Sequence, residues 1–83
     1  MVIPMASKRY NGWSSKTAWN IALWILNTES TYRLITELAI LNNRETVARF
    51  LSNAWEGKRT PDGYKYSYKS IHEAIADFEF AGD

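Results

Sequence analysis

Cysteine is absent from this 83-residue chain, and histidine occurs once, as His72. Disulfide bonds and cysteine-rich zinc sites are therefore excluded. A metal needs three or four converging ligands, so a lone histidine beside Glu73 and Asp77 is typical of a surface residue. The four glycines are isolated from one another, so the chain has no glycine-rich loop to hold a phosphate. We expect neither a metal nor a cofactor.

An excess of charge of one sign is also lacking, because ten Lys and Arg face nine Asp and Glu for a net charge of +1. This balance excludes both a polyanionic mimic of DNA and a strongly basic coat for nucleic acid. The longest apolar run, residues 21–26, is far shorter than the roughly 20 residues that cross a membrane. Segment 1–9 lacks the order of a secretory signal. We expect a cytoplasmic protein without a membrane partner.

Aromatic residues are plentiful, with twelve in the chain, and each can bury a large apolar area. A chain of this length supports one small core, so residues 1–83 are expected to form a single domain. Residues 1–9 contain Pro4 and show no periodicity, which predicts a flexible arm.

The pattern of apolar residues predicts an all-α bundle of four helices, at about 15–27, 29–41, 43–55 and 71–79. The first helix has Ser14 or Ser15 as its cap and is apolar nearly all round, so we expect it to be the central helix. Apolar stripes are expected on the next two helices, including Tyr32, Leu34, Ile35, Leu38, Ala39 and Leu41, and then Val47, Phe50, Leu51, Ala54 and Trp55.

Capping boxes are predicted at two helix starts, Asn42 with Glu45 and Ser70 with Glu73. Residues 57–69 are predicted to be an irregular connection, because Pro61-Asp62-Gly63 specifies a turn and residues 64–68 have no second strand to pair with. Asn20 lies within the apolar first helix, where we expect its amide to hold a loop backbone.

Catalytic chemistry is not indicated by any cluster of residues. The acids Glu73, Asp77 and Glu79 fall in the last predicted helix and are typical of a solvated face. The serines at 14, 15, 67 and 70 are explained as caps or loop residues, and none has a base beside it. We therefore predict a protein that is not an enzyme and has no catalytic residues.

Basic and aromatic residues alternate after the third predicted helix, which is the most functional pattern in the chain. Tyrosine and arginine suit a protein interface, whereas basic side chains between aromatic rings also suit a nucleic acid. The sequence leaves both partners open. The predicted partner-binding residues are Arg44 and Arg49 on the outer face of the third predicted helix, and Lys58, Arg59, Tyr64, Lys65, Tyr66, Tyr68 and Lys69 after it.

The N-terminal tryptophan block carries a resemblance to a known group of proteins. Tyr10-Asn11-Gly12-Trp13, Thr17-Ala18-Trp19-Asn20 and Leu23-Trp24-Ile25-Leu26-Asn27 resemble the pattern Tyr-x-Gly-Trp, Thr-Trp-Asn and Leu-Trp of a family of small bacteriophage and prophage proteins. The turn Thr60-Pro61-Asp62-Gly63 is similar to a later turn of that family. Ala18 departs from the pattern by separating Thr17 from Trp19.

The resemblance implies a phage-type protein without known catalytic residues. Small phage proteins of this kind commonly bind a host protein, and inhibition of a host defence system, as by an anti-CRISPR protein, is one concrete form. The expected function is therefore binding and inhibition or modulation of a host protein in the host cytoplasm. The alternative is a nucleic-acid-binding accessory protein that uses the basic and tyrosine-rich segment 58–69. The oligomeric state is left open.

Overall fold

A computed structural model of the chain describes residues 15–82, and within them the fold is all-α. The helices are α1 (Lys16–Leu26), α2 (Glu29–Leu41), α3 (Arg44–Ala54) and α4 (Tyr68–Ala74). The four predicted helices are thus confirmed, and the part described has no strand beyond an isolated bridge between Arg59 and Lys65. The predicted arm 1–9 lies outside the described residues.

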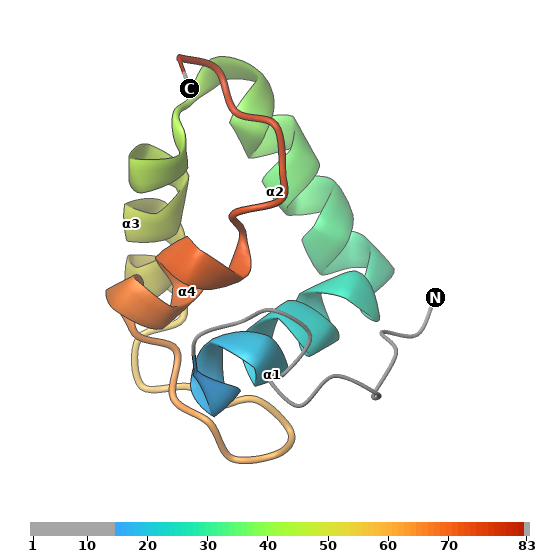
Figure 1. The fold of residues 1–83 in the computed structure, drawn as a ribbon, viewed down its shortest axis with the longest axis vertical. Coiled ribbons are helices and arrows are strands. Elements are labelled where there is room, and N and C mark those ends of the chain that lie inside the picture. The colour runs from blue at the N-terminus through green and yellow to red at the C-terminus, as the bar shows by residue number, and fades with distance from the viewer. Residues whose placement is uncertain (1–14, 83) are drawn as a thin grey trace.

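Each helix packs against two others, so the four form a closed ring in the order α1, α2, α3, α4. The short α4 lies between α1 and α3 (Figure 1). The first helix is strongly buried, as expected, but within residues 15–82 it contacts α2 and α4 and not α3. It is therefore one side of the ring and not its centre. The core is formed by Ile21, Ala22, Ile25, Ile35, Ala39, Val47, Ala48, Leu51, Ile71, Ala74, Ile75 and Phe80.

Single polar side chains cap the start of α1, the end of α2 and the start of α3, whereas Thr28 at the start of α2 makes no side-chain cap hydrogen bond. The Ser15 hydroxyl accepts a hydrogen bond from the Ala18 amide at 3.1 Å, which confirms one of the two serines expected at this helix start. At α3 the predicted box is wrong by one residue, because Asn43 accepts from the Thr46 amide at 2.8 Å. Asn42 instead donates to the Leu38 carbonyl and closes the end of α2.

The last helix differs most from its predicted range of 71–79. Its cap is Ser67, whose hydroxyl accepts from the Ser70 amide at 3.2 Å, so the helix begins three residues early and Ser70 lies inside it. It also ends early, because Ala76 and Phe78 donate to carbonyls three residues back and form turns. These turns place Phe78 against Tyr32 and bring the buried Phe80 into the core.

The C-terminal tail continues along α2 toward the α2–α3 connection (Figure 1). There the Ala81 amide donates to the Ala39 carbonyl at 3.0 Å, so the tail is fixed to α2.

The apolar stripes of α2 and α3 are only partly buried. Ile35, Ala39, Val47 and Leu51 are in the core, but Leu41 is 84% exposed and Phe50 is 50% exposed. Ala54, Tyr32 and Leu34 are also exposed, contrary to the predicted inner stripes. The reason is that, among the helices of residues 15–82, α2 packs only against α1 and α3, and α3 only against α2 and α4, so each leaves part of its apolar stripe without a helix neighbour.

Ser67 and Ser70, the two serines at the start of α4, give a direct test of where the helix begins. Ser67→Ala removes the cap of an exposed amide and should lower the free energy of unfolding by about 1 kcal/mol. Ser70→Ala places alanine inside a helix and should change it by less than about 0.5 kcal/mol. Urea unfolding followed by circular dichroism measures both, and a larger loss for Ser70→Ala would contradict the assigned cap.

Candidate interaction surfaces

The predicted partner-binding residues separate into two surfaces in the structure. Lys58, Arg59 and Tyr66 line a groove at the end of α3, whereas Arg49 and Tyr68 meet across the α3–α4 contact, with Arg44 nearby. Lys65 and Lys69 are exposed and line neither of these surfaces. Tyr64 is half-buried in the loop between α3 and α4. The sequence predicts these nine residues as partner-binding, in segment 58–69 and on the outer face of the third helix, and the fold divides them between two surfaces and exposed positions outside both.

The groove, called the Trp55 groove below, has a volume of about 340 Å³. The rings of Trp55 and Tyr66 lie 4.7 Å apart between centroids with their planes at 52°, and they form its aromatic wall. Lys58 and Arg59 are exposed at its edge, and neither is paired with a carboxylate within residues 15–82. The lining residues are Trp24, Ile25, Thr28, Thr31, Trp55, Lys58, Arg59, Pro61 and Tyr66.

Burial raises the pKa of the Tyr66 phenol above its ordinary value of 10.0. The hydroxyl is protonated at neutral pH, as it also is at the ordinary value, and can donate a hydrogen bond.

A tight turn holds the basic residues of the groove in place. The Thr60 amide donates to the Tyr64 carbonyl at 2.8 Å, and the Gly63 amide donates to the Thr60 carbonyl at 2.8 Å. The Thr60 hydroxyl accepts from the Tyr64 amide, and Arg59 Nη1 donates to the Gly63 carbonyl at 3.0 Å. Gly63 has a φ of +94°, a conformation that favours glycine, so the predicted turn is confirmed with a defined backbone.

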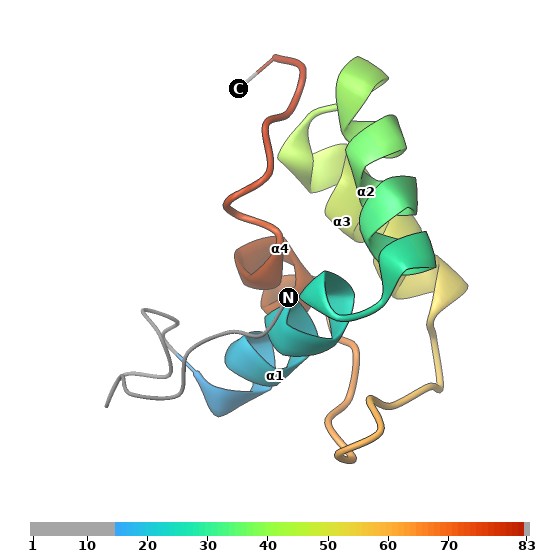
Figure 2. The same cartoon turned by 90° about the vertical axis from the view of Figure 1, so that its right-hand side faces the viewer.

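One carboxylate fixes this turn to α1. Asp62 Oδ2 accepts a hydrogen bond from Asn20 Nδ2 at 2.8 Å and another from Trp24 Nε1 at 3.0 Å. Figures 1 and 2 both place the loop after α3 at the α1 end of the molecule. Asn20, which is 2% exposed, thus holds a loop as expected, but its partner is a side chain and not the backbone.

The second surface, called the Arg49–Tyr68 face below, joins α3 to α4. The Arg49 guanidinium lies 5.2 Å from the centroid of the Tyr68 ring, which in turn lies 5.6 Å from the His72 ring. Arg44 Nε donates to the His72 carbonyl at 2.7 Å. These contacts use Arg44, Arg49 and Tyr68 to hold α4 on α3, so their role in the fold is clear without a ligand.

Sequence reasoning missed the residues that complete the Trp55 groove. The sequence predicts Pro61 as a turn residue and Trp55 as part of an inner stripe, and it places Trp24 only in the tryptophan block. Asp62 lies 42 residues from Asn20 and 38 from Trp24, so no local pattern indicates that they meet. The available signal was the isolated Asn20 in an apolar helix, which requires a polar partner somewhere in the fold.

Residues 15–82 contain neither a group of metal-ligating side chains nor a membrane-spanning helix. No three His, Asp or Glu side chains in this part of the chain gather as a metal ion would need. None of the helices described here has the length and apolar character to span a bilayer.

The contact between Asp62 and α1 predicts a pH dependence. Hydrogen bonds from Asn20 and then Trp24 lower the pKa of Asp62 below its ordinary value of 3.8. The stability that the ionised carboxylate contributes is therefore complete above pH 3.8 and is lost as the pH falls through the lower pKa of the folded state.

Asp62→Asn should be less stable than the wild type at neutral pH, and this difference should shrink as the pH falls below 3.8. Asp62→Ala should be less stable than Asp62→Asn, because it leaves the buried Asn20 amide without an acceptor. Urea unfolding at a series of pH values gives both comparisons. A difference between the wild type and Asp62→Asn that does not change with pH would contradict the assignment.

The similarity of this chain to known proteins is found at the level of a protein family. No curated protein and no solved structure matches the chain. A family model described as a family of unknown function (DUF7249) matches residues 6–79, which include all four helices and both surfaces. The chain is therefore a member of the DUF7249 family of proteins.

Proposed function

We propose that this is a non-catalytic phage-type protein that binds a host protein in the host cytoplasm and inhibits or modulates it. We further propose that the Trp55 groove is its binding surface. An inhibitor of a host defence system, of the anti-CRISPR kind, is one form of this function. The phage origin rests on the resemblance of the tryptophan block, and the binding role rests on the composition of the groove.

The observation that carries the proposal is a cluster of aromatic rings beside exposed basic side chains that have no carboxylate partner within residues 15–82. Trp24, Trp55 and Tyr66 line the groove, and Lys58 and Arg59 are exposed at its edge. Trp, Tyr and Arg are the residues that most often dominate the binding energy of protein interfaces. Such a groove suits an acidic segment whose apolar side chains contact the rings and whose carboxylates meet Lys58 and Arg59.

The groove also gives support to the alternative, a nucleic-acid-binding accessory role. Aromatic rings next to exposed cations can bind a single strand through base stacking and phosphate contacts. However, Trp55 and Tyr66 pack against each other at 4.7 Å, which uses part of the ring surface that a base would need. Protein binding is therefore the preferred function.

A capture experiment followed by a titration tests the proposal. The tagged protein should recover one stoichiometric partner from a nuclease-treated lysate of the bacterial host. Lys58→Glu should weaken binding of the purified partner by about tenfold or more, because it reverses a charge at the edge of the groove. Lys16→Glu makes the same charge change at an exposed position outside the groove and should leave the Kd within about twofold.

The salt dependence of binding identifies the result that would contradict the proposed function. If the purified protein instead binds single-stranded or duplex nucleic acid with an affinity that falls steeply as salt rises, and recovers no protein, the accessory role replaces the proposed function.

A further inference from the structure

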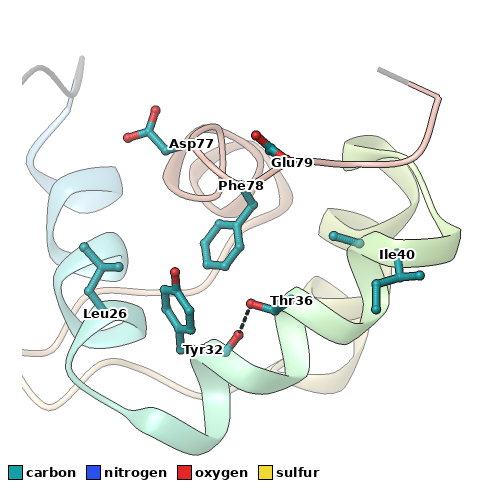
Figure 3. Close-up of a pocket in the computed structure, with 8 residues that line it drawn as sticks. Leu26, Tyr32, Thr36, Ile40, Asp77, Phe78 and Glu79 are labelled. Atoms are coloured by element: carbon teal, nitrogen blue, oxygen red, sulfur yellow. Dashed lines mark hydrogen bonds between the residues drawn. The ribbon is translucent and has the colours of Figure 1, made fainter.

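A second hollow lies between α2 and the C-terminal tail, and the Trp55 groove shares no residue with it. Its volume is about 420 Å³, and it is called the α2 trough below. Figure 3 shows Leu26 at one end, Ile40 at the other, and the rings of Tyr32 and Phe78 between them. The lining residues are Leu26, Tyr32, Thr36, Ala39, Ile40, Asp77, Phe78 and Glu79.

The floor of the α2 trough is apolar and open to solvent. The Tyr32 and Phe78 rings pack at 5.1 Å between centroids, and Tyr32 remains 45% exposed. Ile40 is 66% exposed although it is one of the larger aliphatic residues of the chain. Tyr32, Thr36 and Ile40 are spaced by four residues and therefore form one line along α2, about 12 Å long at 1.5 Å per residue.

The edge of the α2 trough is acidic. Asp77 and Glu79 are exposed on the tail, and Figure 3 shows their carboxylates on the same side of the Tyr32 and Phe78 rings. Within residues 15–82 neither carboxylate is paired with a basic side chain, and no Lys or Arg lines the trough. The trough thus has the opposite charge from the Trp55 groove.

We propose that the α2 trough binds a basic amphipathic helical segment of a partner protein. Apolar side chains on one face of such a segment would cover Tyr32, Phe78 and Ile40, and its Lys or Arg residues would meet Asp77 and Glu79. The line along α2 matches about two turns of helix. The acidic edge repels phosphate, which disfavours a nucleic acid here. This surface is separate from the Trp55 groove and does not depend on the function proposed for it.

Fluorescence anisotropy with a labelled synthetic peptide tests the proposal on the full chain. The probe is a helical peptide of leucine and lysine, compared with a second peptide that has glutamate in place of every lysine. The lysine peptide should bind at low salt and the glutamate peptide should not. Ile40→Ser should weaken binding about tenfold, because the apolar contact is lost while the charge is unchanged. Asp77→Asn with Glu79→Gln should remove most of the salt dependence of the Kd.

Matched controls separate the trough from general attraction between the peptide and the protein. Leu41 is 84% exposed and adjacent in sequence to Ile40 but does not line the trough, so Leu41→Ser should leave the Kd unchanged. Glu37→Gln removes an exposed acid of α2 outside the trough and should also have no effect. Lys58→Glu should preserve binding of the lysine peptide, because Lys58 lines the Trp55 groove and not the trough. The peptide test of the trough is therefore independent of the function proposed for the Trp55 groove.

Three results would overturn the proposal. The first is no binding of the lysine peptide at low salt, and the second is an equal effect of Ile40→Ser and Leu41→Ser. The third is a dimer in sedimentation that Ile40→Ser dissociates, because the occupant would then be a second copy of the chain. The substituted side chains are exposed, so circular dichroism should show all these variants folded; the double charge variant tests the site should Ile40→Ser fail to fold.

Discussion

The position of the Trp55 groove depends on a single oxygen, Asp62 Oδ2, which accepts hydrogen bonds from both Asn20 and Trp24. Asn20 is buried in α1 and cannot exchange its partner for water without moving, so the loop is held from the side of the helix. The tight turn around Thr60 then transmits this position to Arg59. One carboxylate in the loop therefore places the Trp24 ring of α1 and the Arg59 cation relative to each other on this surface.

The positive and negative side chains at the two hollows lie in different regions of the surface, although the net charge of the chain is close to zero. The chain is nearly neutral, yet the Trp55 groove carries Lys58 and Arg59 while the α2 trough carries Asp77 and Glu79. Both hollows have aromatic rings at their base. The two hollows have similar aromatic rings but edges of opposite charge, which favours different partners. Each edge attracts a segment of the complementary charge and repels a segment of its own charge.

The helices could be predicted from sequence because their caps and apolar spacing are local, as at Ser15. The start of α4 could not, since Ser67 and Ser70 are both suitable caps. What favours Ser67 is the placement of Tyr68, which contacts His72 one turn later and Arg49 on α3. Lys58, Arg59 and Tyr66 were predicted as candidate site residues, but Trp24 and Asp62 join them only through packing between distant segments. The exposure of Ile40 and Leu41 was also hidden, because apolar spacing does not reveal whether a neighbouring helix exists.

The walls of the Trp55 groove come from α1, α2, the end of α3 and the loop after it, so the groove exists only where these distant segments are packed together. A ligand of this groove therefore binds the native state and not the unfolded one, and its binding free energy adds to the stability of the entire domain. Affinity and thermal resistance are in this way thermodynamically linked: residues that never touch the ligand can change its apparent Kd when they destabilise the fold.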